Sequence, residues 1–163
     1  MIADDPVPAY DGPLIGALLR MPWETVRTRM LRGLHERGFS DLHAAHLVLL
    51  QYPGPSGLRP SELAERSRMS KQALNYLLGQ MEELGYTTRR EEPGSRRFKR
   101  IELTERGWAA VRAKRAIVLE VEEEWERELG PERFALLREL LIELQRSHPA
   151  SSAPDARELQ RIV

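Results

Sequence analysis

The side chains best suited to specific chemistry lie on one short segment that begins at Ser70. Lys71, Gln72, Asn75 and Tyr76 share the polar face of this segment. An amide side chain pairs a donor with an acceptor, as the major-groove edge of adenine does. A lysine can reach guanine or phosphate, and a tyrosine can donate to phosphate or pack on a thymine methyl. The pattern is typical of a helix that reads the major groove of double-stranded DNA, although such residues also occur on solvated helix faces.

A predicted β-hairpin after this helix supplies positive charge. Segments 86–91 and 97–103 are rich in β-forming residues, and they flank the turn Pro93-Gly94-Ser95. Four basic residues crowd the tip and the strand that leaves it: Arg96, Arg97, Lys99 and Arg100. Arginines on such a hairpin can enter a narrow minor groove, and Arg97, followed by Arg96, is the best candidate. We expect Arg66 and Arg68, beside two helix starts, to contact phosphates.

Other chemistries have less support in the sequence. The chain contains no glycine-rich phosphate loop and no nucleophile elbow, so we expect no catalytic residues, and hence no enzyme. His43 and His46 could share a metal with Glu36 or Asp41, as in a metal-responsive regulator, but two histidines at this spacing are more often structural. We therefore expect neither a metal nor a cofactor. The hairpin could also bind an acidic protein instead of DNA.

Charge is segregated along the chain, although it sums to zero. The 163 residues include 25 Lys and Arg, 25 Asp and Glu, and no Cys. Bases outnumber acids over residues 70–100, whereas residues 120–128 are strongly acidic, which we interpret as a solvated helix flank. The lack of cysteine excludes disulfides, thiolate zinc sites and cysteine-based redox sensing. Without a membrane-length apolar run or a secretory signal at its start, the chain is expected to be soluble and cytoplasmic.

Helical periodicity predicts the elements that precede the polar segment. Apolar residues three or four apart predict an amphipathic helix over 14–34, which Pro22 either kinks or divides and which Gly38 ends. A second, buried helix is expected over 42–50, capped by Ser40 or Asp41. A proline-rich loop follows this second helix.

The remaining elements are predicted from their caps and breakers. Pro60 begins a third helix that ends near Ser67, and the fourth helix runs from Ser70 to Gly85. Thr104 caps a long fifth helix with an apolar repeat of about seven residues and Lys114 as its polar exception. Gly130-Pro131 separates it from a sixth helix. The apolar residues of these last two helices are Val111, Val118, Val121, Trp125, Phe134, Leu137 and Leu141.

This order of elements predicts a mainly α fold with a small β-hairpin wing. We expect a winged helix-turn-helix at about 56–104, flanked by dimerisation helices at about 14–38 and 105–146. Together they make a single domain over 14–146. A flexible N-terminal segment, 1–13, precedes it, and a polar C-terminal tail, 147–163, follows.

The segment around the polar helix and the hairpin resembles the multiple antibiotic resistance regulator (MarR) family. The resemblance runs from Pro60-Ser61-Glu62-Leu63-Ala64-Glu65-Arg66 to Glu92-Pro93-Gly94-Ser95-Arg96-Arg97-Phe98-Lys99-Arg100 and on through Gly107. Its most specific part is Leu103-Thr104-Glu105-Arg106-Gly107, after the wing. It implies a sequence-specific transcriptional regulator, a ligand-responsive repressor that binds a pseudo-palindromic DNA operator as a homodimer.

The resemblance also implies roles for residues outside the DNA-binding segment. The first, fifth and sixth helices would form the dimer interface, including the seven apolar residues named above. A small aromatic or hydrophobic effector would bind between the dimer base and the winged region, where Trp23, Phe39, Tyr52 and Trp108 are candidates, although large aromatic residues are more often plain core.

Two positions depart from the family pattern. Ser95 stands where an aspartate commonly braces a wing arginine, which implies a looser wing. Tyr76 stands where a basic residue is frequent, which implies a different operator or phosphate contact there.

Overall fold

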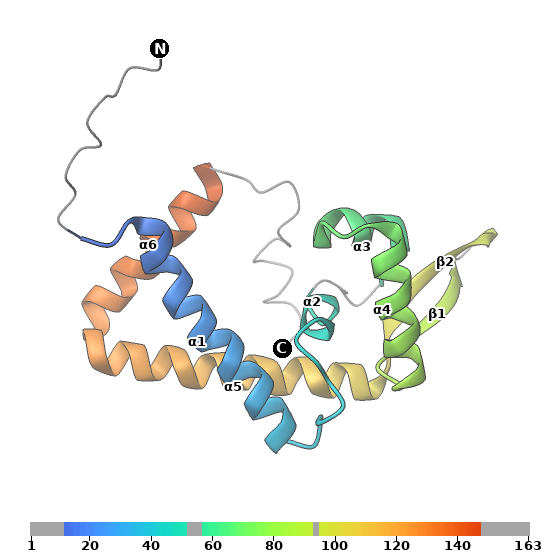
Figure 1. Ribbon diagram of the computed structural model, residues 1–163, viewed down its shortest axis with the longest axis horizontal. Helices are drawn as coiled ribbons and strands as arrows, with labels where there is room; N and C mark the ends of the chain where they lie inside the picture. Colours follow the sequence, from blue (N-terminus) through green and yellow to red (C-terminus); the bar gives the residue numbers. More distant parts are fainter. Residues whose placement is uncertain (1–11, 52–56, 93–94, 148–163) are drawn as a thin grey trace, which may run out of the picture.

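The computed structural model describes residues 12–51, 57–92 and 95–147, with the backbone alone for residues 92 and 95–98. Six helices and one hairpin follow in the order α1 (Ile15–Glu36), α2 (His46–Leu49), α3 (Pro60–Ser67), α4 (Lys71–Glu83), β1 (Thr87–Glu92), β2 (Ser95–Leu103), α5 (Glu105–Leu129) and α6 (Pro131–Ser147). Figure 1 shows α5 as a long base, with α3, α4 and the hairpin, here called the winged lobe, at one end and α6 at the other. The mainly α fold with a small wing is as predicted.

Helix α1 crosses α5 and continues without a break through Pro22. The hydroxyl of Thr25 donates to the Met21 carbonyl at 3.2 Å, one turn back along the helix. The sequence left open whether Pro22 kinks or divides the helix, and the structure shows a single element. The helix ends at Glu36, and Gly38 then takes a φ of 90°, a conformation that glycine adopts without strain.

Acidic side chains of α5 bind the helices on both sides of it. Glu124 pairs with Arg29 of α1 at 2.5 Å, and Glu120 pairs with Arg37 of the same region at 2.6 Å. Glu122 pairs with Arg138 of α6 at 2.7 Å. Glu120, Glu123, Glu126 and Glu128 are exposed, as expected of a solvated flank over 120–128, and the ion pairs of Glu120, Glu122 and Glu124 are an addition that the sequence did not indicate.

Helix α2 is much shorter than the sequence predicts. Only His46–Leu49 is helical, and Ala45 at its start makes no side-chain cap. The expected capping residue, Asp41, instead accepts a hydrogen bond from the hydroxyl of Tyr86 and one from Arg106. Because its carboxylate is used elsewhere, residues 40–45 form turns and irregular chain in place of a helix, although Leu42 and Leu47 are buried as expected.

The winged lobe follows the predicted caps closely. Helix α3 ends at Arg68, which takes a left-handed conformation with φ 54° and turns the chain toward α4. The Ser70 hydroxyl then accepts from the backbone N–H of Ala73 at 3.2 Å, which caps α4. Strands β1 and β2 pair antiparallel with Thr87 opposite Leu103, and an isolated bridge from Leu58 to Ile101 adds one more contact. The predicted turn residues 93–94 lie outside the described residues.

One apolar core joins the winged lobe to the helical base. Leu63 of α3, Leu78 and Met81 of α4, and Ile101 of β2 are at most 1% exposed. Tyr86, which leads from α4 into β1, is also completely buried. The same core takes in Ala110 and Ile117 of α5 and Leu34 of α1. No helix among the described residues is long and apolar enough to cross a membrane.

Two helical glycines make a matched test of how tightly α5 packs on the winged lobe. A Cβ at Gly107 would lie 2.2 Å from the Tyr86 carbonyl oxygen, whereas a Cβ at Gly79 would meet nothing within 4 Å. Gly107→Ala should therefore destabilise the protein by about 1–3 kcal/mol or more through overpacking. Gly79→Ala should stabilise it by about 0.5–1 kcal/mol through helix propensity. Urea denaturation measures both, and equal effects of the two substitutions would contradict this packing.

Candidate nucleic-acid interface

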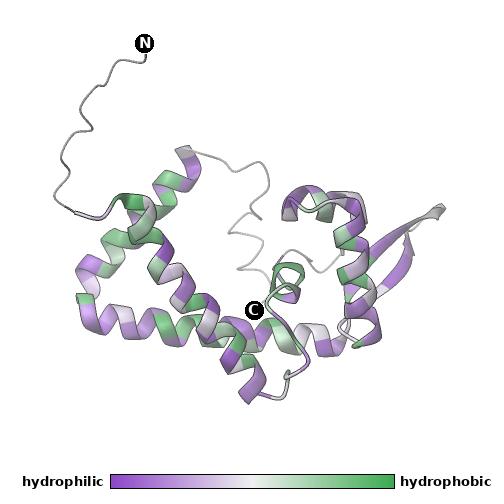
Figure 2. Cartoon of the chain, viewed as in Figure 1, coloured by the Kyte–Doolittle hydropathy of each residue, from purple (hydrophilic) through white to green (hydrophobic). Residues whose placement is uncertain are grey.

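Helix α4 is split between a buried apolar side and an exposed polar side. Leu74, Leu77, Leu78 and Met81 are buried against the lobe. The opposite side carries the four residues that the sequence assigns to the major groove, Lys71, Gln72, Asn75 and Tyr76, and each of them is exposed, as is the capping residue Ser70. Figure 2 shows this alternation of hydrophilic and hydrophobic residues along α4. The structure thus brings these four side chains together on the solvent side of one helix.

Arg68 lies exposed at the turn before α4, beside the capped start of that helix. A helix start presents backbone N–H groups that no residue inside the helix can accept, and these groups favour phosphate. Arg68 and the α4 N-terminus therefore offer donors from the same corner of the lobe.

Several basic side chains of the wing make ion pairs or hydrogen bonds with other groups of the protein. Arg89 pairs with Glu82 of α4 at 3.0 Å, Arg90 pairs with Glu102 across the hairpin at 3.1 Å, and Arg100 donates to the Gly57 carbonyl at 2.8 Å. Lys99, which faces Glu91 in the strand register, is exposed. The structure places the backbone of Arg96 and Arg97 in β2, near the hairpin tip, while their side chains lie outside the described residues.

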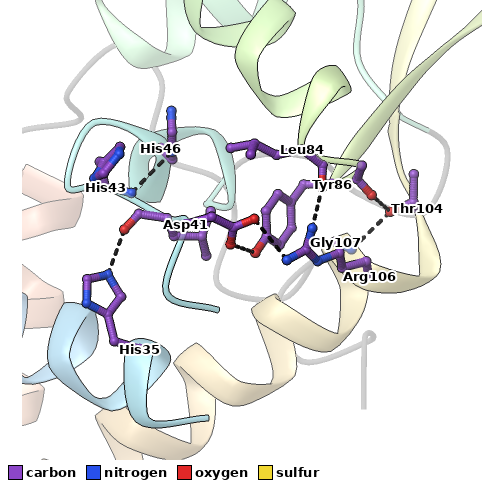
Figure 3. A network of polar contacts seen from close by, with 11 residues as sticks. His35, Asp41, His43, His46, Leu84, Tyr86, Thr104, Arg106 and Gly107 are labelled. Carbon is purple, nitrogen blue, oxygen red and sulfur yellow. Dashed lines mark hydrogen bonds and ion pairs between the residues drawn. The ribbon is translucent and has the colours of Figure 1, made fainter. Parts of the chain in front are cut away.

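A polar junction holds the winged lobe to the helical base (Figure 3). The Tyr86 hydroxyl donates to Asp41 Oδ1 at 2.5 Å, and the guanidinium of Arg106 lies 2.9 Å from Asp41 Oδ2. The same guanidinium sits 4.4 Å from the centre of the Tyr86 ring and donates to the Leu84 carbonyl. Three separate parts of the chain therefore meet at Tyr86: the segment before α2, the end of α4 and the first turn of α5.

Electrostatics in this junction favour the charged form of Asp41. Burial acts to raise the pKa of its carboxyl, but the hydrogen bond from Tyr86 and the charge of Arg106 outweigh it and lower that pKa. Burial, followed by the hydrogen bond to Asp41, raises the pKa of Tyr86 far above its ordinary value. Tyr86 is thus a hydrogen-bond donor and Asp41 a carboxylate at neutral pH.

Thr104 strengthens the start of α5 at the same place. Its hydroxyl accepts from the backbone N–H of Gly107 at 3.1 Å, as the sequence predicts for a cap, and it also donates to the Gly85 carbonyl at 2.6 Å. Residues Thr104, Arg106 and Gly107 of the segment after the wing therefore connect the end of α4 with the start of α5.

His43 and His46 are not arranged as a pair of metal ligands, because the ring of His46 is used in hydrogen bonds within the protein. Nδ1 of the buried His46 lies 3.2 Å from the backbone nitrogen of His43, and its Nε2 lies 3.2 Å from Oε1 of Gln80. Both ring nitrogens of His46 are thus engaged in hydrogen bonds. The described part of the chain contains no group of three or more His, Cys, Asp or Glu residues that could hold a metal ion.

The aromatic residues proposed for an effector pocket are dispersed. Trp23 is 54% exposed on α1, whereas Phe39 and Trp108 pack against the core, with the Phe39 ring 6.3 Å from that of Tyr86. Tyr52 lies outside the described residues. A cavity of about 370 Å³ lies elsewhere, between α1 and the segment before α2, and Trp23, Phe39 and Trp108 are not among the described residues that line it. The described residues that line it are Arg27, Thr28, Leu31, Arg32, His35, Glu36 and Ala44.

Lys114 occupies an inward position of α5. It continues the series formed by Gly107, Ala110, Ile117 and Val121, which are all buried. Its Nζ donates to the Leu50 carbonyl, beyond the end of α2, at 3.0 Å. Burial lowers the pKa of this ammonium group to about 8. The polar exception in the predicted heptad is therefore a lysine whose charged form is destabilised by burial, which lowers the stability of the folded protein at neutral pH.

Apolar residues predicted for the dimer interface divide into two groups. Val121 and Phe134 are buried inside the protomer, and Val111, Val118 and Trp125 are partly covered by it. Leu137 and Leu141 of α6 are exposed. More exposed apolar side chains accompany them on the first half of α1 and on α6: Leu14, Ile15, Leu18, Leu19, Met21, Leu136, Leu140, Ile142 and Leu144.

Several residues of this site had no signal in the sequence. Asp41 contacts Arg106 across 65 positions and Tyr86 across 45, so no local pattern could pair them. Gln80 is one helical turn from Tyr76, and that spacing could have indicated their contact. The partner of Gln80 on α2, His46, could be found only from the fold.

Comparisons with known proteins agree with the winged architecture. Residues 29–97 match the family model described as the MarR family. A MarR family protein of Mycobacterium tuberculosis, solved in complex with salicylic acid, is 26% identical and has a TM-score of 0.61, over 82% of this chain and 98% of that one. The wild-type MarR protein of E. coli is 21% identical with a TM-score of 0.66, over 82% and 98% of the two chains. NadR in complex with 4-hydroxyphenylacetate is 21% identical with a TM-score of 0.59, over 85% and 96%. None of the curated proteins matches the sequence.

Lys114→Met tests the cost of the buried ammonium group. Below pH 8 the lysine is protonated in the folded and the unfolded chain, so the full cost is present. Between pH 8 and its ordinary pKa of 10.5 only the unfolded chain keeps the proton. Wild-type stability should therefore rise with pH relative to the variant, by up to about 3 kcal/mol.

Urea denaturation of both proteins at pH 7 and pH 10 measures this change. Lys99→Met, at an exposed lysine, is the control and should show no such trend. A Lys114→Met effect that is the same at both pH values would contradict the burial of this charge.

Proposed function

We propose that this chain, which belongs to the MarR family of winged helix-turn-helix transcriptional regulators, binds a pseudo-palindromic operator in double-stranded DNA as a homodimer. It acts as a ligand-responsive repressor, in the cytoplasm, and not as an enzyme. One observation carries the proposal: the exposed side of α4 gathers two amides, a lysine and a phenol, directly opposite a buried apolar stripe. Such a side fits the major groove, which is about 12 Å wide and exposes the hydrogen-bonding edges of the bases.

The charge distribution supports DNA as the partner in spite of the zero net charge. The acidic residues Glu120, Glu122 and Glu124 are engaged with bases of α1 and α6, at the end of α5 away from the winged lobe. Exposed Lys71, Arg68 and Lys99 remain on the lobe. Binding then depends on where bases are placed and not on their total number.

Ligand response follows from the way two lobes must fit one duplex. Half-sites lie about 34 Å apart, one turn of DNA. A small shift of the winged lobe relative to α5 therefore spoils the fit of a dimer to both half-sites. A relative with 26% identity was solved with salicylic acid, which supports a small aromatic or hydrophobic effector for this chain. The metal-responsive alternative loses support because both nitrogens of His46 are already bonded.

The homodimer is supported by apolar surface that one chain leaves uncovered. Figure 2 shows hydrophobic residues on the first half of α1 and along α6, at the end of the molecule away from α4. Six large apolar residues of α6 are at least 37% exposed. A contiguous surface of this kind is typical of an interface between subunits.

Selection of duplexes from a random pool with the purified protein tests the function. A regulator of this type should enrich one inverted repeat whose half-sites are one helical turn apart. Affinity for it should fall steeply with salt, because each phosphate contact releases counterions. A winged helix that binds an acidic protein instead would enrich no sequence at any salt concentration.

Substitutions on the lobe should separate positioning from base reading. Arg97→Ala should weaken binding to all duplexes and lower the salt slope. Gln72→Ala or Asn75→Ala should cost about 1–3 kcal/mol and relax the preference at one base pair. Fluorescence anisotropy with the selected duplex and single-base variants of it measures these effects. Arg127→Ala, an exposed arginine far from α4, is the control. Wild-type affinity in all three lobe variants would refute this assignment of the site.

Charge placed on α6 should open the dimer without unfolding the chain. Leu140 and Leu144 are 49% and 50% exposed, so Leu140→Glu with Leu144→Glu should leave the protomer core intact and bury unpaired charge only in the dimer. Sedimentation should give the mass of two chains for wild type and of one for the variant, with the same helix content. Gln145→Glu, which adds charge beside the apolar residues, should remain a dimer. A wild-type mass of one chain would contradict the proposal.

A further inference from the structure

A line of hydrogen bonds leads from the buried ring of α2 to the exposed side of α4. His46, which is 2% exposed, places Nε2 at 3.2 Å from Oε1 of Gln80. Nε2 of Gln80 lies 3.2 Å from the hydroxyl oxygen of Tyr76, one helical turn away. Tyr76 itself is 67% exposed. A side chain on the DNA-facing side is thus connected through one amide to the interior of the protein.

The backbone fixes the direction of every bond in this line. The N–H of His43 can only donate, so Nδ1 of His46, 3.2 Å away, must accept. In the neutral ring the hydrogen then lies on Nε2, which donates to Oε1 of Gln80. The amide of Gln80 is held in one orientation as a result, and its NH₂ group faces Tyr76.

Tyr76 is therefore left with a defined role as a donor. Its hydroxyl oxygen accepts from Gln80 on the protein side. Its own hydrogen then points away from Gln80, on a side chain that lies mainly in solvent. A hydroxyl that is already held in place loses less conformational freedom on binding than a freely rotating one.

We infer that Tyr76 donates a hydrogen bond to an acceptor on duplex DNA, and that Gln80 and His46 are positioning residues that impose this direction. The inference rests on the proposed DNA-binding function. The matching groups on DNA are acceptors: a phosphate oxygen, O6 or N7 of guanine, N7 of adenine, or O4 of thymine. The amino group of cytosine is a donor and does not match.

Gln80 also has a plainer interpretation, as a tie between α2 and α4 with no effect on Tyr76. The two interpretations differ in how substitutions combine. If Gln80 acts through the Tyr76 hydroxyl, removing that hydroxyl also removes the effect of Gln80. If it only ties two helices, its loss and that of the hydroxyl are independent and their effects multiply.

A double-mutant cycle on operator affinity separates them. Tyr76→Phe removes the hydroxyl and keeps the ring, and Gln80→Met removes the amide and keeps the length of the side chain. Using the duplex recovered by selection, at one salt concentration, we expect Tyr76→Phe to weaken binding about fivefold to tenfold, the effect of one hydrogen bond. Gln80→Met should weaken binding by a smaller factor than Tyr76→Phe does. The double variant should bind the duplex no more weakly than Tyr76→Phe alone.

Two controls keep the result specific. Gln72→Ala with Gln80→Met should give losses that multiply, because these residues do not share a bond. His46→Gln keeps a donor near the position of Nε2 and should bind better than His46→Leu at equal thermal stability. Single-base variants of the duplex distinguish the acceptors: a Tyr76→Phe loss that is uniform indicates phosphate, and one that disappears at a single base pair indicates a base.

The inference is overturned if Tyr76→Phe binds like wild type, or if the losses from Tyr76→Phe and Gln80→Met multiply. Either result, with wild-type protein that binds the selected duplex, leaves the proposed function intact. Failure of the wild-type protein to select any duplex would instead remove the proposed function itself.

Discussion

The polar junction of Asp41, Tyr86 and Arg106 is the contact on which the position of α4 depends. Tyr86 is buried at the point where α4 passes into the wing, and its hydroxyl and ring are held by groups from two other parts of the chain. Asp41 and Arg106 are partly exposed, so their ion pair contributes modest free energy. Its effect is geometric, because it fixes the angle between the winged lobe and α5, with Gly107 allowing the close approach.

This geometry connects the elements that we propose to read DNA with those that we propose to join two subunits. The ion pairs of Glu120 and Glu124 hold α1 on α5, and the junction at Tyr86 holds α4 on the start of α5. Helix α5 is therefore the common base for both. In a dimer, the separation of the two α4 helices follows from how each lobe is set on its own α5. In the proposed dimer, an effector that shifts the lobe slightly would change that separation and so release DNA at a distant place.

Local signals in the sequence were sufficient for much of the fold. The caps at Ser70 and Thr104, the proline at the start of α3 and the breaks at Gly85 and Gly130 each act within a few residues, and the structure has them where they were predicted. The short α2 was missed because the carboxylate expected to cap it is bound by side chains distant in sequence. The exposed polar side of α4 was predictable from periodicity, whereas the bond from His46 to Gln80 was not, because these residues are 34 positions apart.

The separation of the two α4 helices tests the account most directly, and the cysteine-free chain makes it measurable. Glu83→Cys gives one spin label per chain, on an exposed residue at the end of α4 away from its capped start. Pulsed dipolar spectroscopy should show one distance distribution between the labels of the two subunits. The distribution should become narrower when the selected duplex binds, with a mean consistent with recognition helices about 34 Å apart. Adding Arg106→Met should broaden this distance distribution. No distance between subunits, or one that the duplex and Arg106→Met leave unchanged, would contradict the account.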